Sequence, residues 1–166
     1  MKIELFEYDK SWPAKFQAEK ELLQKHIGAY LVGSIEHVGS TSVPGMVAKP
    51  IIDIMFGVKS LKESESAIEI LSSNGYCFYP YKPDVMHWFC KPKPEFRTHH
   101  IHLVPFKCEL WQERIKFRDA LRHSQSLAHE YIEVKRSLAA SNSADREVYT
   151  KGKWPFIKSV LDGEYC

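Results

Sequence analysis

One stretch of this sequence, residues 33–58, constrains the fold more than any other. It holds two apolar segments separated by a turn rich in glycine and hydroxyl residues. The first segment, residues 31–38, alternates imperfectly between apolar and polar residues, as short half-buried strands do. The second, residues 50–58, is a nearly continuous apolar run, which is typical of a strand buried on both faces. We therefore predict two neighbouring strands, residues 34–38 and 50–58, in one sheet.

The turn between these strands, Gly39-Ser40-Thr41-Ser42, has the composition of a phosphate site. Glycine permits a close backbone approach or a positive φ, and hydroxyls and amides at such a turn can bind an anion. The alternative is an ordinary turn capped by serine and threonine, which is common in proteins. We place the turn outside the core, so removing the Ser40 and Thr41 hydroxyls should leave folding nearly intact.

A single carboxylate interrupts the second apolar segment. Asp53 stands between Ile52 and Ile54. A carboxylate in such a run is costly to bury unless it is paired, hydrogen-bonded or bound to a metal. Asp53 is therefore a candidate functional residue.

A third informative segment is the predicted strand at residues 97–106. On a strand, His100 and His102 project from one face, while His99 and Ile101 project from the other. Adjacent imidazoles can ligate a metal, or bind phosphate when they are protonated. The alternative is a pair of surface histidines, or of core histidines hydrogen-bonded to the backbone.

The run HVGSTSVPGMVAKPIIDI, residues 37–54, resembles the signature of the GrpB family, whose members resemble nucleotidyltransferases in fold. The resemblance also covers the Tyr-Asp-x-x-Trp segment at residues 8–12 and the Arg-x-His-His-x-His strand at residues 97–102. It continues through the Phe-Arg-Asp-x-Leu segment at residues 117–121 and through residues 131–138, so it spans most of the chain.

The resemblance implies roles for particular residues. In the nucleotidyltransferase superfamily, a Gly-Ser turn after one strand holds the nucleotide phosphates and an acidic residue on the next strand holds the metal. Ser40 and Asp53 fall on those positions. The chain departs from the pattern at Met55, where these enzymes usually carry a second carboxylate, and this departure argues against a standard two-metal site.

Together these observations define a candidate site. We predict that Asp53, His100 and His102 converge and serve as catalytic residues and metal ligands. The sheet order does not follow from the sequence, so this convergence rests on the family resemblance and on the cost of an unpaired buried carboxylate. The residues assigned to phosphate binding are Gly39, Ser40, Thr41, Ser42, Lys49 and Arg97.

Three functions fit this site. The first is a metal-dependent nucleotidyltransferase-like protein that acts on or binds a nucleoside triphosphate or related phosphate ligand, with Mg or Mn as the metal and an open acceptor. The second is a mononuclear hydrolase in which Asp53, His100 and His102 hold Zn, Mn or Fe. The third is a non-catalytic module for a nucleotide or a coenzyme A-related ligand. Met55 favours this reading, as does the resemblance to GrpB-like domains fused to a coenzyme A biosynthetic kinase.

Composition and net charge restrict the classes of molecule that this protein is expected to bind. The 166 residues, 44% of them hydrophobic, fit one globular domain over residues 1–166. The net charge of +2 argues against nucleic acid and acidic membranes, which leaves a small phosphate-bearing ligand; the oligomeric state stays open. No signal peptide or membrane-spanning run is evident, so we expect a cytoplasmic location. The four scattered cysteines are predicted to be free thiols.

The predicted fold class is α/β (α+β): a nucleotidyltransferase-like mixed sheet with flanking helices and a helical C-terminal third. Strands are predicted at residues 2–7 and, as an antiparallel meander, at 76–81, 86–91 and 97–106. Helices are predicted at residues 12–27, 60–71, 110–121, 127–138 and 154–161, with a break at residues 141–143. Arg118, Lys135 and Lys151 are candidates for binding a substrate phosphate, but we expect each of them to lie on a solvated helical face.

Overall fold

A five-stranded sheet forms the centre of the protein. The structure is a computed structural model and describes residues 3–141 and 145–163. Its strand order is β1-β2-β5-β4-β3. The strands are β1 (Ile35–Val38), β2 (Ile52–Val58), β3 (Cys77–Tyr79), β4 (His87–Lys93) and β5 (Phe96–Pro105). Strands β2 and β5 are parallel and the other neighbouring pairs are antiparallel, so the predicted mixed sheet is confirmed.

Two pairings in this sheet position the candidate site. Strands β1 and β2 are antiparallel neighbours, as predicted, and Val38 lies opposite Asp53. Strand β5 lies on the other side of β2, in a register that places His100 opposite Asp53. The antiparallel meander of β3, β4 and β5 is also confirmed.

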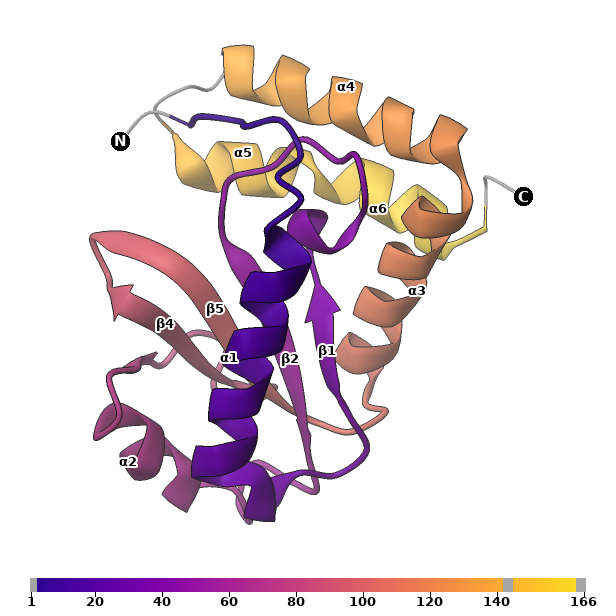
Figure 1. The fold of residues 1–166 in the computed structure, drawn as a ribbon. Helices are drawn as coiled ribbons and strands as arrows, with labels where there is room; N and C mark the ends of the chain where they lie inside the picture. The colour runs from indigo at the N-terminus through magenta and orange to yellow at the C-terminus, as the bar shows by residue number, and fades with distance from the viewer. Residues whose placement is uncertain (1–2, 142–144, 164–166) are drawn as a thin grey trace.

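Helices cover both faces and one end of the sheet (Figure 1). Helices α1 (Trp12–Ile27) and α2 (Ser66–Ser72) lie on one face, and α3 (Glu109–His123) lies on the other. Helices α4 (Gln125–Ser141), α5 (Arg146–Gly152) and α6 (Trp154–Leu161) pack together across the end of the sheet where β1 finishes. The predicted helical C-terminal third is therefore present.

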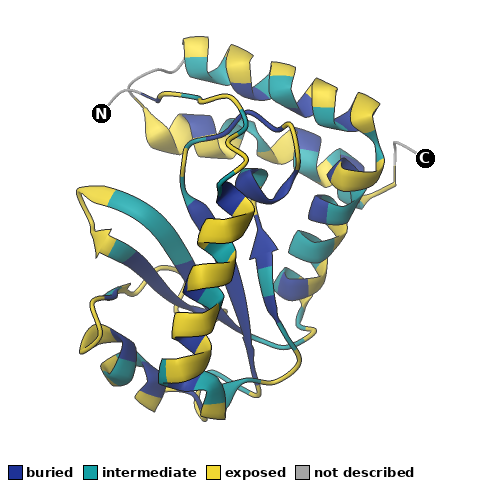
Figure 2. Cartoon of the chain, in the orientation of Figure 1, coloured by how far each residue is buried: buried dark blue, intermediate teal, exposed yellow. Residues whose placement is uncertain are grey.

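The two-residue period of the strands divides the core into two faces. Ile52, Ile54 and Phe56 pack toward α1 and α2, whereas Met55 packs toward α3 with Trp88 and Trp111. Figure 2 shows strand β2 and the inward sides of the helices as largely buried. Asp53 has the parity of Met55, so its side chain lies on the α3 face.

Three local predictions need correction. The strand predicted over residues 2–7 is reduced to one bridge, between Phe6 and Ala48, because its partner is the irregular connector before β2. The helix predicted from Ser60 starts at Ser66, since residues 61–65 form turns. Helix α5 was not predicted; it begins where Asp145 accepts hydrogen bonds from two helix amides.

Some predictions concern residues outside the described part of the chain. The break predicted at residues 141–143 lies there, apart from Ser141, which ends α4. Cys77, Cys90 and Cys108 are free thiols as predicted, whereas Cys166 is outside the described residues. Over residues 3–141 and 145–163, every helix is too short or too polar to cross a membrane.

Candidate functional site

The turn after β1 presses against Asp53, and a glycine makes this approach possible. Gly39 has φ of 72°, in the left-handed region that favours glycine. A Cβ atom at this position would lie 2.5 Å from Asp53 Oδ2. The sequence signal for Gly39 thus has a physical basis: any other residue would be strained and would collide with the carboxylate.

Two of the three hydroxyls in this turn have structural contacts. Thr41 and Ser42 are buried, so the prediction that the turn lies outside the core was wrong for these residues. The Thr41 hydroxyl donates to the Ile51 carbonyl and accepts from His37 Nε2, 2.9 Å away. Burial lowers the pKa of His37 to about 4, which keeps it neutral. The Ser42 hydroxyl donates to the Gly39 carbonyl. These contacts fix the turn, and Ser40 is the hydroxyl that faces a charged group.

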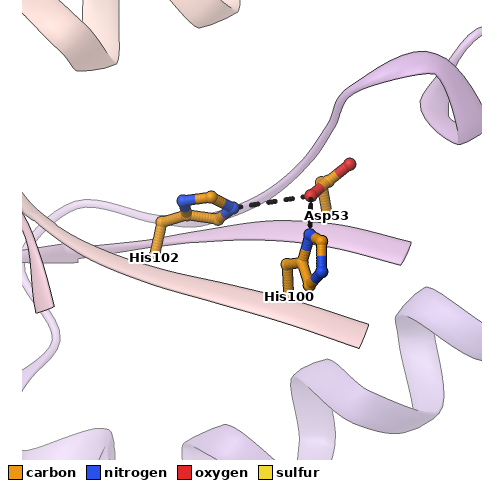
Figure 3. Close-up of side chains that lie close together, drawn as sticks. All are labelled: Asp53, His100 and His102. Atoms are coloured by element: carbon orange, nitrogen blue, oxygen red, sulfur yellow. Dashed lines mark hydrogen bonds and ion pairs between the residues drawn. The ribbon is translucent and has the colours of Figure 1, made fainter. Parts of the chain in front are cut away.

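Asp53, His100 and His102 meet on the α3 face of the sheet, as predicted (Figure 3). Asp53 Oδ1 lies 3.1 Å from His100 Nδ1 and 3.5 Å from His102 Nε2. The three donor atoms all lie within 4.8 Å of one another. The parallel pairing of β2 with β5 produces this convergence. The catalytic and metal-binding roles of these residues remain predictions.

The charges in the site are strongly coupled. Burial alone would raise the pKa of Asp53, but hydrogen bonds and charge from His100 and His102 hold it well below its usual range. Burial and the nearby Arg114 lower the pKa of His102 to about 4, so this imidazole is neutral near pH 7. The Asp53 side chain is still 28% exposed, so a ligand can reach the ionised carboxylate.

The donor set fits a single metal ion. On a tetrahedral ion with bonds of about 2.0–2.1 Å, neighbouring donor atoms are about 3.3 Å apart. The two separations from Asp53 Oδ1 bracket that value. Two imidazoles and one carboxylate suit Zn, Mn or Fe better than Mg. His100 Nε2 is buried and has no hydrogen-bond partner among the described residues, so contact with Trp88 orients this ring in place of a second hydrogen bond.

Three lysines, Lys49, Lys135 and Lys153, either contact the turn or interact electrostatically with Asp53. Lys135 of α4 is 1% exposed and donates to Ser40 Oγ, 3.0 Å away, and to the Val47 carbonyl. Lys49 and Lys153 each lie 4.8 Å from the centre of the Tyr149 ring. In the part of the chain that the structure describes, no carboxylate forms an ion pair with any of these three ammonium groups.

This lysine cluster, Lys49, Lys135 and Lys153, is short of negative charge. Burial and the neighbouring lysine lower the pKa of Lys135 to about 7. Burial and nearby cations likewise lower the pKa of Lys49 to about 8, and burial lowers the pKa of Lys153. Asp53 interacts electrostatically with Lys49 and Lys153 but does not neutralise the cluster. A phosphate chain would supply the missing charge.

Lys135 is buried, and the prediction that it lies on a solvated face was wrong. A signal was present: Lys135 follows Tyr131 by one helical turn, on the apolar stripe of its helix. Arg118 was also misplaced, because it is buried and pairs with Glu36 at 2.7 Å and Asp119 at 2.9 Å. Lys151 is exposed, as predicted.

The residues that the sequence predicted to bind phosphate lie in two separate parts of the structure. Gly39, Ser40 and Lys49 lie beside Asp53 or the lysine cluster. Arg97 instead lies at the start of β5, where its Nε donates to the Pro94 carbonyl and its guanidinium lies over the Trp88 ring. No contact among the described residues joins Arg97 to the turn, and its binding role remains a prediction.

Comparison with known proteins agrees with this architecture. A family model described as GrpB protein matches residues 2–163. The UPF0157 protein PA4798 of Pseudomonas aeruginosa is 37% identical over 164 residues, covering 96% of this chain and 66% of the relative. A dephospho-CoA kinase of Mycolicibacterium paratuberculosis is 27% identical over 183 residues, covering 95% and 45%. The chain therefore spans less than two thirds of the length of either relative.

A solved structure has the same fold over nearly the whole chain. The crystal structure of conserved protein GrpB from Enterococcus faecalis superposes with a TM-score of 0.85 at 26% identity. The match covers 98% of this chain and 100% of that one.

Proposed function

The chain belongs to the GrpB family, and we propose that it is a metal-dependent, nucleotidyltransferase-like enzyme acting on a nucleotide or a related phosphate ligand. One observation carries the proposal. A carboxylate with two imidazoles lies beside a turn whose serine accepts a hydrogen bond from a buried lysine. A candidate metal centre thus adjoins a candidate anion site, which is the combination that transfer at a phosphate requires.

The residues divide into two groups with separate tasks. Asp53, His100 and His102 would hold the divalent ion, which when bound neutralises charge on the reacting phosphate. The low pKa of His102 suits a ligand better than a proton acceptor at neutral pH. The donor set favours Mn or Zn over Mg as this ion.

The second group would bind the remaining phosphates. The Lys135 Nζ donates to Ser40 Oγ and the Val47 carbonyl and lies 4.8 Å from the centre of the Tyr131 ring, so Lys135 would act on a ligand through Ser40. Ser40 accepts from Lys135, so its own hydrogen can be donated to a phosphate oxygen. Lys49 and Lys153 would add charge beside this pair of donors.

Adjacent histidines on β5 provide a matched test of the metal centre. We expect purified wild-type protein to bind about one Mn or Zn per chain, measured by elemental analysis after dialysis. His100→Gln and His102→Gln should both lose this metal. His99→Gln should retain it, because His99 lies on the opposite face, near Glu19. Equal metal content in all four proteins would contradict the assignment.

A thermal-shift screen tests the ligand. ATP with Mn should raise the melting temperature of the wild type more than ATP or Mn alone, since the metal and Lys135 would bind one phosphate chain together. Ser40→Ala is the suitable variant, because Thr41 is buried and its removal would disturb folding as well. An unchanged shift in Ser40→Ala would reduce the turn to a structural role.

A second candidate is a non-catalytic binding or accessory module. Met55 is fully buried in the apolar cluster under α3, so the position of the usual second carboxylate belongs to the core. The match to a dephospho-CoA kinase makes a coenzyme A-related nucleotide a reasonable ligand for such a module. Incubation with ATP and Mn, with and without hydroxyl-bearing acceptors, separates the candidates: transfer joins the nucleotide to the acceptor and releases pyrophosphate only when the acceptor is present. Hydrolysis at a mononuclear site releases nucleotide or phosphate without an acceptor, and a binding module gives neither product.

A further inference from the structure

An aromatic surface, formed by strands β3, β4 and β5 and the loop after β3, adjoins the candidate metal centre. We define it as Tyr79, Tyr81, Trp88 and Arg97. Trp88 lies opposite His102 in the sheet, and Tyr79 lies opposite Trp88. The Trp88 ring is 5.0 Å from the His100 ring and 6.3 Å from each tyrosine ring, measured between centroids. Ring contacts therefore run without a break from His100 to the edge strand.

The outer members of this surface are open to solvent. Tyr79 is 61% exposed and Tyr81 is 45% exposed, whereas Trp88 beneath them is 7% exposed. A single exposed aromatic residue needs no explanation. Here, however, two exposed phenol rings pack on one tryptophan that contacts a candidate metal ligand. Figure 2 shows that the outer end of the β4–β5 hairpin is also exposed.

A β-bulge brings Arg97 onto the same surface. His99 pairs with Lys91 and Arg97 pairs with Pro92, so Thr98 is an extra residue in β5. A bulge changes the side-chain alternation of its strand. The Arg97 guanidinium carbon lies 5.2 Å from the centre of the Trp88 ring. A planar guanidinium is itself a surface on which flat rings stack.

Arg114 links the aromatic surface to the metal centre from the α3 side. Its Nη1 is 3.4 Å from His102 Nδ1, and it interacts electrostatically with both Asp53 and Tyr81. The Tyr81 ring contacts Trp88, which in turn contacts His100, so one residue separates Tyr81 from the candidate metal centre.

The sheet order places the lysine cluster and the aromatic surface on opposite sides of the metal centre. The Ser40 turn follows β1, whereas Trp88 is on β4, and Asp53 on β2 and His100 on β5 lie between them. A ligand with its phosphates at Ser40 and Lys135 would extend past Asp53 over β4. We propose that the aromatic surface is the subsite for the planar ring of that ligand, a nucleobase stacked against Tyr81 and Arg97. This inference rests on the proposed function, because it requires the phosphates to bind at Ser40.

Inorganic tripolyphosphate and ATP, titrated by calorimetry in the same Mn buffer, separate the two subsites. Both probes carry the phosphate chain, and only ATP carries a ring. Wild type should bind ATP at least about tenfold more tightly than tripolyphosphate, since base stacking on aromatic and arginine side chains contributes on this scale. Tyr81→Ala should lower ATP affinity about tenfold and leave tripolyphosphate affinity unchanged.

Three variants control for folding, ring and charge. Phe78→Ala removes a ring from the opposite face of β3 and should change neither affinity. Tyr81→Phe keeps the ring and should keep wild-type affinity for ATP. Arg97→Lys keeps the charge but loses the planar group, and it should weaken ATP and not tripolyphosphate.

Each result supports or overturns the aromatic subsite. Equal affinity of the wild type for ATP and tripolyphosphate overturns it and leaves the phosphate site standing. The same holds if Tyr81→Ala and Arg97→Lys bind ATP as the wild type does, or if Tyr81→Phe loses as much affinity as Tyr81→Ala. Failure of the wild type to bind either probe overturns the aromatic subsite together with the proposed function.

Discussion

Each face of the sheet holds a carboxylate near histidines and cationic side chains. The two faces differ in whether these neighbours balance the charge of the carboxylate. On the α1 face, Glu19 is 3% exposed; it accepts a hydrogen bond from the Tyr76 hydroxyl and pairs with Lys91 at 2.9 Å. His99 Nε2 lies 3.9 Å from the same carboxylate. The negative charge of Glu19 is balanced by the positive charge of Lys91, so this network has no net charge and its carboxylate is shielded from solvent.

On the α3 face, Asp53 lies among two imidazoles and several cationic groups. His100 and His102 contact it, Arg114 lies behind His102, and the lysine cluster lies beyond the Ser40 turn. Among the described residues, the cluster has no carboxylate of its own.

Adjacent residues of β5 thus serve different purposes. His99 points into a network whose charges cancel within the protein and which joins α1 to the sheet. His100 points into a group whose charges do not cancel. This difference is the reason that we assign the candidate site to Asp53 and not to Glu19: Glu19 is 3% exposed and pairs with Lys91, whereas the Asp53 side chain is 28% exposed. Substitutions that neutralise each carboxylate in turn test this contrast.

The largest expected effect is the loss of metal from Asp53→Asn. The variant keeps the shape of the side chain but removes one of three protein donors, so its affinity for Mn or Zn should fall at least about 100-fold. Calorimetric titration of metal into dialysed protein measures this fall. Glu19→Gln is the matched control and should bind metal with wild-type affinity. Wild-type metal affinity in Asp53→Asn would show that Asp53 is not a metal ligand.

Glu19→Gln should instead destabilise the fold. Removing this charge leaves the partly buried Lys91 without its partner and weakens the bond from Tyr76, so the free energy of unfolding should fall by about 2–3 kcal/mol. Urea denaturation followed by circular dichroism measures the change. A loss below about 0.5 kcal/mol would show that the Glu19 network is not a structural element.

Lys135→Met should weaken anion binding by a smaller factor. It removes one buried ammonium and its hydrogen bond to Ser40 while keeping the length of the side chain, so affinity for tripolyphosphate should fall about tenfold. Lys151→Met is the control, since Lys151 is exposed and pairs with Glu147. Equal losses in the two variants would indicate a general charge effect.

A further expected effect is a change in how stability depends on pH. The pKa of Lys135 is about 7 in the folded protein and about 10.4 in an unfolded chain. Between these values the unfolded chain binds a proton that the folded protein does not, so this residue makes stability rise as pH increases from 7 to 10. Urea denaturation at pH 7 and pH 9.5 should show wild type gaining stability relative to Lys135→Met. A difference independent of pH would contradict the lowered pKa.

Local sequence patterns predicted the elements that carry the site. The alternation at residues 97–106 placed His100 and His102 on one face, and the glycine before Ser40 indicated a close backbone approach. Both signals depend on neighbouring residues, which the strand and turn geometry arranges without help from the rest of the chain.

The sequence by itself determined the strand carrying Asp53, the turn before it and the facing pair of histidines, because these features follow from short-range backbone geometry. Only the tertiary structure decided which strands are neighbours. Strand β5 inserts beside β2 although β3 and β4 precede it in the chain, and this order brings His100 opposite Asp53. The burial of Lys135 against Ser40, and of Thr41 and Ser42 in the core, likewise depends on α4 packing over the turn. Such contacts join residues about a hundred positions apart, and no local pattern encodes which of several apolar faces a helix will cover.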